Sequence, residues 1–150
     1  MVSLPKRNKL VAFLRSKFGF LEFLVWYPFQ KPEYYQVVCL LLSIFFPLVQ
    51  NNFLKILFVA FIILLDWYDG AAARKYNKSS PNGWLSDVAV DRVSEGLLFI
   101  NLIGSAIGKL FFAAYLINII LSYKSYVTKK HFILPLRFFF LIYLLITSLI

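Results

Sequence analysis

Residues 53–73 read FLKILFVAFIILLDWYDGAAA, and this stretch decides the fold. Its first thirteen residues are apolar apart from Lys55, and Asp66 and Asp69 follow without ending the run. About 20 predominantly apolar residues are long enough to cross the hydrocarbon core of a bilayer as a helix. We therefore predict a membrane-spanning helix that carries two carboxylates near its C-terminal end.

The rest of the 150-residue chain has the same apolar character. Hydrophobic residues make up 61% of the chain and charged residues 15%, whereas a soluble domain carries about 25% charged residues. Four further apolar runs approach the spanning length, at about 34–50, 84–107, 109–123 and 132–150. None of them alternates as the strands of a membrane barrel do. The sequence predicts an all-α, polytopic membrane bundle of about five to six transmembrane helices.

Residues 1–31 differ from the rest because lysines and arginines alternate with aromatic and aliphatic residues. The charges are too dense for a span, and this mixture is typical of a helix that lies in the membrane interface. We predict a basic amphipathic segment over 1–31, followed by a transmembrane domain over 32–150.

The positive charges predict an orientation. Of the sixteen lysines and arginines, six precede residue 34, three lie at 74–78 and three at 124–130, whereas the intervening turns hold only Lys55 and Lys109. Cytoplasmic loops of membrane proteins carry the excess of Lys and Arg. We predict a multi-pass protein of the cytoplasmic membrane with its N-terminus and its site on the cytoplasmic side, among membrane lipids. No nucleic-acid recognition motif accompanies the net charge of +9.

The acidic residues point to a site. Asp66 and Asp69 are three residues apart, and Asp87 and Asp91 are four apart, so each pair shares one face of its helix. Two adjacent helices joined by a short loop can aim all four carboxylates into one cavity. Ionised groups at membrane depth cost at least ~2.5 kcal/mol each, and Arg92 alone cannot neutralise four of them. All-oxygen ligands suit Mg²⁺ or Mn²⁺. A structural polar cluster or a proton path remains the alternative.

Small and basic residues stand at fixed distances from these aspartates, in the pattern D-x2-D-G-x2-A-R-x8-G-x3-D-x3-D over 66–91. Gly70 and Ala73 are small enough for a ligand to approach the helix backbone. Arg74 offers a planar fork for phosphate oxygens. Close helix packing and a topology anchor are the structural explanations for each residue taken alone.

The complete pattern resembles that of the CDP-alcohol phosphatidyltransferases, and all eight defining positions match. The resemblance implies a transferase of phospholipid biosynthesis, in which the hydroxyl of a small alcohol attacks the lipid-side phosphorus of a CDP-linked lipid and CMP leaves. It implies that Mg²⁺ or Mn²⁺, as two ions, is held by Asp66, Asp69, Asp87 and Asp91, and that Asp91 is also the catalytic base. It assigns the CDP-lipid to Gly70, Ala73, Arg74, Ser80 and Gly83, and it implies a homodimer.

The acceptor alcohol is less defined. The sequence Asp91-Arg92-Val93-Ser94-Glu95 is similar to members that use inositol phosphate or glycerol phosphate, and a phosphorylated acceptor needs further cations. The candidate acceptor-binding residues are Arg137, Arg92 and Lys124, with Lys129 and Lys130 as additional candidates. Arg137 stands inside the apolar run LPLRFFFLIY, where an arginine either faces the bundle or snorkels.

Two alternatives come from other functional classes. The first is a transporter or assembly protein that uses the acidic cluster for ion coupling, and the second is an intramembrane prenyltransferase. Metal-dependent CMP release separates both from a phosphatidyltransferase. The family generally has six spans and the apolar runs here number five, which leaves a truncated gene, a minimal variant or an extra span within 10–29 as alternatives.

Overall fold

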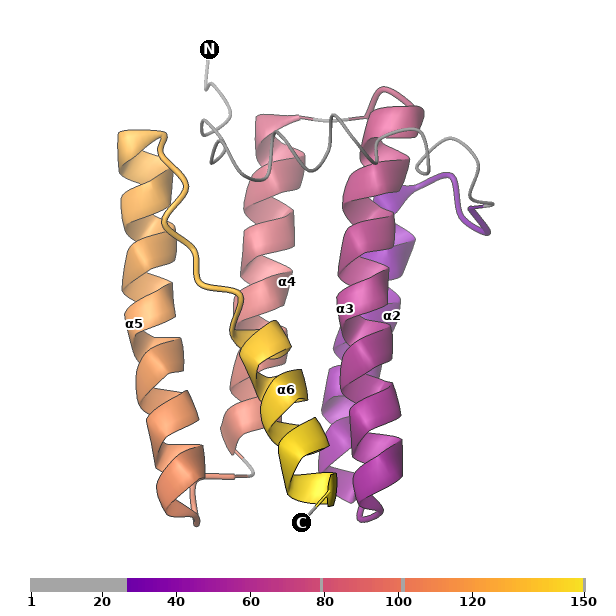
Figure 1. The fold of residues 1–150 in the computed structure, drawn as a ribbon. Coiled ribbons are helices and arrows are strands. Elements are labelled where there is room, and N and C mark those ends of the chain that lie inside the picture. Colours follow the sequence, from indigo (N-terminus) through magenta and orange to yellow (C-terminus); the bar gives the residue numbers. More distant parts are fainter. Residues whose placement is uncertain (1–26, 79, 101, 150) are drawn as a thin grey trace.

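The structure is a computed structural model that describes residues 27–78, 80–100 and 102–149, and this part of the chain is helical (Figure 1). The elements are α2 (Pro32–Phe45), the short 3-10 helix η1 (Phe46–Leu48), α3 (Asn52–Lys75), α4 (Pro81–Ile100), α5 (Ala106–Thr128) and α6 (Leu136–Leu149). The all-α class predicted from the sequence is confirmed for these residues. The predicted interfacial helix over 1–31 falls mostly outside them, and its described part, 27–31, is not helical.

The helix boundaries follow local chemistry. Pro32 begins α2, where a missing N–H costs nothing. Asn51 caps α3, because its side-chain oxygen accepts hydrogen bonds from the N–H groups of Phe53 at 2.8 Å and Leu54 at 3.2 Å. Lys129 ends α5 in the left-handed conformation, with φ of 56°.

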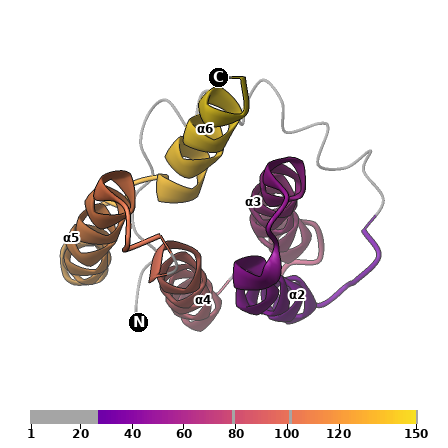
Figure 2. The same cartoon turned by 90° about the horizontal axis from the view of Figure 1, so that it is seen from below.

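The helices form a bundle in which α2 packs against both α3 and α4, while α6 packs against α3 and α5 against α4 (Figures 1 and 2). The hydroxyls of Ser43 and Ser94 hydrogen-bond to each other across the contact between α2 and α4. Small residues of this kind let membrane helices approach closely. The region between α3 and α4, which α2 flanks, is where the site lies.

The interior of the bundle is polar as well as apolar. Buried apolar residues such as Val59, Ile62 and Phe140 share it with polar or charged residues, of which nine are buried within the described part of the chain. These nine are Gln36, Ser43, Asp69, Ser94, Glu95, Asn118, Ser122, Ser125 and Arg137. Large apolar side chains such as Leu110 and Ile120, 68% and 66% exposed, face outward instead. Soluble monomers rarely expose extended apolar surface, so this distribution fits a lipid environment.

The count of membrane spans needs correction. Five α-helices lie in the described residues, and two of them, α3 and α5, are long and apolar enough to cross a membrane. The segment Pro32–Leu48 and helix α6 are apolar but shorter. Helix α4 has 20 residues but carries four charged side chains. The prediction of five to six spans is therefore too high by this measure, because α4 carries site residues and α2 and α6 are short.

The predicted runs also differ from the helices at their ends. The run 34–50 is interrupted after Phe45 because Pro47 follows, and η1 takes its place. The run 132–150 becomes helical only at Leu136, after a non-helical segment over 129–135.

Candidate functional site

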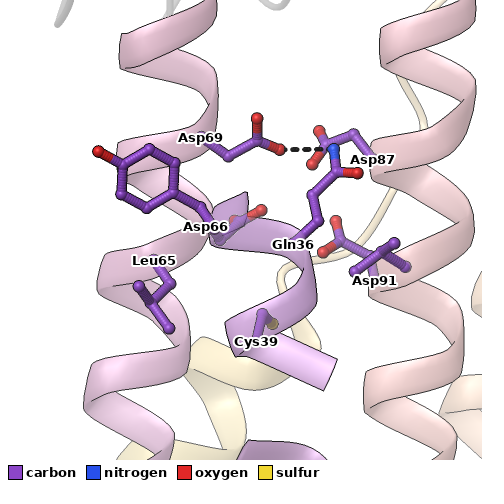
Figure 3. A pocket seen from close by; sticks show the side chains of 9 residues that line it. Gln36, Cys39, Leu65, Asp66, Asp69, Asp87 and Asp91 are labelled. Atoms are coloured by element: carbon purple, nitrogen blue, oxygen red, sulfur yellow. Dashed lines mark hydrogen bonds between the residues drawn. The ribbon is translucent and has the colours of Figure 1, made fainter. Parts of the chain in front are cut away.

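Four aspartates face one another across the space between α3 and α4. Asp66 and Asp69 project from the C-terminal half of α3, Asp87 projects from the N-terminal half of α4, and Asp91 projects from its middle (Figure 3). Carboxylate oxygens of Asp66, Asp87 and Asp91 all lie within 4.8 Å of one another. Asp69 is not in that triad but lines the same pocket. The predicted convergence of the two helix faces is thus what the structure contains.

The pocket is closed on one side by α2. Besides the four aspartates it is lined by Tyr35, Gln36, Cys39, Leu65 and Val90. The side chain of Asp66 is 42% exposed and that of Asp91 is 21% exposed, so a ligand in the pocket can reach both carboxylates. Beside the apolar wall, charges in the pocket interact with one another more strongly than they would in water.

Gln36 of α2 links the two acidic helices, and sequence reasoning missed it. Its Nε2 donates to Asp69 Oδ2 at 2.8 Å (Figure 3). Its Oε1 accepts from Ser86 Oγ at 3.0 Å. The side chain is buried. The signal in the sequence was an amide inside an apolar run, which in a membrane helix has to find a partner within the protein.

Arg137 of α6 enters the acidic cluster. Its Nη2 lies 2.8 Å from Asp91 Oδ1 and also donates to the Asp91 carbonyl oxygen at 3.2 Å. Its Nη1 lies 4.0 Å from Asp66 Oδ1. Of the two orientations expected for an arginine in this apolar run, the guanidinium takes the one that faces the bundle. It therefore bridges α6 to one carboxylate of α4 and one of α3.

The carboxylates outnumber the positive charge that Arg137 supplies. Four aspartates and one guanidinium leave three negative charges when all groups are ionised. The donors of the triad are all carboxylate oxygens, the type that Mg²⁺ and Mn²⁺ bind. The residues present therefore fit a divalent metal chemically, through both donor type and excess charge.

Arg92 is paired differently from what its place in the sequence suggests. It was expected beside the aspartates, but its guanidinium contacts Glu95, with Nη2 to Oε1 at 3.1 Å and Nη1 to Oε2 at 3.0 Å. Asn118 donates to the same carboxylate at 3.3 Å. Helical spacing of three residues brings Arg92 to Glu95 and turns it away from Asp91.

The lysines proposed for the acceptor do not line the pocket. Lys124 Nζ lies 5.0 Å from the centre of the Phe132 ring, and Lys129 Nζ lies 4.3 Å from that of Tyr126. Both contacts are near the C-terminal end of α5. Arg137 is therefore the candidate cation that the structure brings to the aspartates.

The residues expected to hold the CDP-lipid lie around the end of α3 and the start of α4. Gly70, Ala73 and Arg74 occupy the last turns of α3. A side chain added at Gly70 would place its Cβ 3.1 Å from Arg74 Nη1, so the guanidinium lies over the glycine. Ser80 Oγ accepts a hydrogen bond from the Gly83 N–H at 2.9 Å, as an N-cap residue does.

The comparisons with known proteins give one family. Residues 34–150 match the family model described as CDP-alcohol phosphatidyltransferase, and this range includes the four aspartates and Arg137. Neither the curated proteins nor the solved structures contain a significant match. Since the match extends over most of the chain, the protein belongs to the CDP-alcohol phosphatidyltransferase family.

Proposed function

We propose that this chain transfers a phosphatidyl or archaetidyl group from a CDP-linked lipid to the hydroxyl of a small alcohol, with release of CMP. Membership of the family supports phosphatidyl transfer in general. The observation that carries the proposal for this chain is the convergence of Asp66, Asp87 and Asp91 within 4.8 Å, beside Asp69 and Arg137.

Asp66, Asp69, Asp87 and Asp91 would hold Mg²⁺ or Mn²⁺, as two ions. The bound metal would polarise the phosphoryl oxygens and stabilise the leaving group. The protein's own contribution is geometric. Gln36 fixes Asp69 through a hydrogen bond of 2.8 Å, and Arg137 fixes Asp91 through an ion pair of 2.8 Å, so both carboxylates are oriented before a ligand arrives.

Asp91 is our proposed base. Its carboxylate takes the proton of the acceptor hydroxyl as the oxygen forms its bond to the lipid-side phosphorus. The bond from that phosphorus to the bridging oxygen breaks, and CMP leaves with the electron pair. The apolar wall formed by Leu65 and Val90 limits access of water, which would otherwise compete with the acceptor.

Gly70, Ala73, Arg74, Ser80 and Gly83 form our proposed CDP-lipid site at the end of α3 and the start of α4. Replacing Gly70 with alanine tests it, because the new methyl meets Arg74 Nη1 at 3.1 Å and must displace the guanidinium by a few tenths of an ångström. One weakened charged hydrogen bond costs about 1 kcal/mol. We expect the KM for the CDP-lipid to rise about 5-fold, with little change in kcat, in steady-state CMP-release assays.

Gly104→Ala is the matched control for that substitution, since its added methyl meets nothing within 4 Å. Equal KM values for Gly70→Ala and the unsubstituted protein would remove Arg74 and Gly70 from the proposed CDP-lipid site.

A phosphorylated polyol, such as inositol phosphate or glycerol phosphate, is our proposed acceptor. Arg137 supports it because its guanidinium lies at the aspartates, with Nη2 2.8 Å from Asp91 Oδ1. Arg92, the second candidate, is engaged by Glu95. Lys124 packs over Phe132. The acceptor proposal therefore rests on Arg137 and places this chain near the phosphatidylinositol-phosphate and phosphatidylglycerol-phosphate synthases.

Replacing Arg137 with alanine tests the acceptor. Loss of a charge-assisted bond to phosphate costs about 2 kcal/mol, so we expect kcat/KM for a phosphorylated acceptor to fall about 30-fold relative to kcat/KM for its unphosphorylated form. Using the ratio cancels the effect of Arg137 on Asp91, which both acceptors share. An unchanged ratio would exclude Arg137 from acceptor recognition.

The proposed setting is the cytoplasmic membrane, with the N-terminus and the site on the cytoplasmic side and a homodimer as the assembly. The topology supports this orientation, because one end of the bundle is more basic than the other. The C-terminal ends of α3 and α5 lie at the same end of the bundle (Figure 1) and carry Arg74, Lys75 and Lys124. Lys55 and Lys109 lie near the opposite ends of these helices. Residues 1–31 would lie in the interface and 32–150 would form the catalytic domain, consistent with α2 beginning at Pro32.

The deciding experiment is CMP release from CDP-diacylglycerol and CDP-archaeol by protein in lipid nanodiscs. We expect release only with both Mg²⁺ or Mn²⁺ and an acceptor, and loss of release with chelator. Glu33→Gln, which removes a carboxylate at the start of α2 outside the pocket, serves as the control. Well-folded protein that releases no CMP with inositol phosphate, glycerol phosphate or their unphosphorylated forms would exclude the transferase and favour ion coupling.

A further inference from the structure

The backbone over 129–135 is not helical, and its residues are half-buried or exposed. Figure 1 shows this segment running back along α5 before α6 begins. Helix α6 has 14 residues, and at 1.5 Å per residue this gives about 21 Å, less than the ~30 Å of a hydrocarbon core. If α6 crosses the core together with this segment, part of 129–135 would lie at the depth where exposed backbone groups are costly, and its N–H and C=O groups would need partners within the protein.

Two buried side chains of α5 supply those partners. Asn118 Oδ1 accepts from the Leu134 N–H at 2.9 Å, and Asn118 Nδ2 donates to the Leu134 carbonyl at 3.1 Å. Ser125 Oγ accepts from the Phe132 N–H at 2.9 Å. Asn118 and Ser125 are both fully buried and lie seven residues apart, which places them on one face of α5 two turns apart. They hold the segment at two points.

Asn118 is itself fixed to α4. Its Nδ2 also donates to Glu95 Oε2 at 3.3 Å, and Glu95 is held by Arg92. Asn118 therefore connects α4, α5 and the segment that leads into α6. Leu134, the residue it holds, is three positions before Arg137, whose guanidinium pairs with Asp91 and approaches Asp66.

We propose that Asn118, assisted by Ser125, is a positioning residue for the site: it fixes the start of α6 so that Arg137 reaches Asp91 and Asp66. The inference rests on the proposed function only for its effect on turnover. The contact itself is a property of the fold, so it is measured in three ways, of which only one needs catalysis.

The experiment is a double-mutant cycle between Asn118→Leu and Arg137→Gln. Leucine keeps the branched shape of the side chain but removes both hydrogen bonds to Leu134 and the one to Glu95. We expect kcat/KM for CMP release to fall about 10-fold in Asn118→Leu, the cost of about 1.4 kcal/mol, and to change less than 2-fold when Arg137 is already glutamine. An equal fall in both backgrounds would show that Asn118 supports only general packing and would overturn the proposal.

Mn²⁺ affinity, followed by electron paramagnetic resonance, gives a readout without turnover. Removing the positive charge beside the carboxylates should tighten Mn²⁺ binding about 10-fold in Arg137→Gln. Asn118→Leu should also tighten Mn²⁺ binding, because it displaces the Arg137 guanidinium. In the Arg137→Gln background, Asn118→Leu should leave the Mn²⁺ affinity unchanged. A purely structural role predicts weaker binding instead.

The double-mutant cycle between Asn118→Leu and Arg137→Gln can also be measured by thermal unfolding, which needs neither metal nor substrate. We expect the loss of melting temperature caused by Arg137→Gln to be smaller when Asn118 is leucine, because the ion pair is then already disturbed. Coupling in this cycle without CMP release would retain the positioning role and reject the transferase. CMP release with additive effects in all three cycles would retain the transferase and reject the positioning role.

Ser125→Ala and Ser122→Ala form a matched pair that covers a failure of Asn118→Leu to fold. Both delete a buried hydroxyl that donates to the carbonyl four residues earlier, at 2.8 Å in each case. Only Ser125→Ala leaves the Phe132 N–H without its partner. We expect Ser125→Ala to lower kcat/KM about 3-fold and to couple with Arg137→Gln, and Ser122→Ala to do neither. Equal effects of the two would contradict the proposal.

Discussion

Replacing Asp91 with asparagine should reduce kcat for CMP release by about 10³-fold while changing affinity for the CDP-lipid by less than about 10-fold. Asparagine keeps the shape of the side chain and one oxygen that can ligate metal, but it cannot take a proton from the acceptor. Asp91 is also the carboxylate that Arg137 contacts at 2.8 Å. The substitution therefore separates proton transfer from binding better than a truncation would.

The measurement pairs single-turnover CMP release with equilibrium binding of the CDP-lipid in nanodiscs. Glu33→Gln provides the matched loss of a carboxylate outside the pocket and should retain activity. If affinity for the CDP-lipid collapses together with kcat, Asp91 is chiefly a metal ligand, and the base has to be sought among the other carboxylates of the pocket.

Replacing Gly108 with alanine should destabilise the protein more than alanine at any other glycine that the structure describes. The new Cβ would lie 1.6 Å from the Leu102 carbonyl oxygen, so the backbone of the turn between α4 and α5 has to move. The N–H of Gly108 donates to Ser105 Oγ at 2.9 Å, and Ser105 Oγ donates to Leu102 O at 3.0 Å. Displacing Leu102 therefore also disturbs the N-cap of α5.

Forced overpacking and a lost cap together cost roughly 3 kcal/mol, which corresponds to a fall in melting temperature of about 10 °C for a chain of this size. Gly104→Ala, two residues outside α5, should leave the melting temperature within about 2 °C, because its Cβ meets nothing within 4 Å. Thermal unfolding of the two variants side by side checks the prediction. Equal melting temperatures would mean that the turn rearranges freely.

The acidic half of the site could be predicted from the sequence because its geometry is local. Spacings of three and four residues place Asp66 with Asp69 and Asp87 with Asp91 on single helix faces, whatever the rest of the bundle does. A loop of a few residues between α3 and α4 then brings the two faces to the same end. The apolar composition fixed the helical class in the same way, because a backbone in lipid has to satisfy its own hydrogen bonds.

The partners of these aspartates could not be predicted in this way. Arg92, one residue from Asp91, pairs with Glu95 instead, whereas Arg137, separated from Asp91 by 46 residues, supplies the ion pair. Gln36 reaches Asp69 across 33 residues. The length of α6 was also overestimated. Apolar composition does not distinguish a helix from a non-helical segment whose backbone hydrogen bonds are made by side chains of a neighbouring helix.

The sequence by itself determined a helical membrane protein with four aspartates on two helix faces, because apolar run length and helical periodicity act over one or two turns. The tertiary structure decided which cation meets those aspartates, where α6 begins and which amide orients Asp69. These depend on how α2, α5 and α6 pack around α3 and α4, and such packing balances burial and polar satisfaction over the whole chain rather than within any short stretch of it.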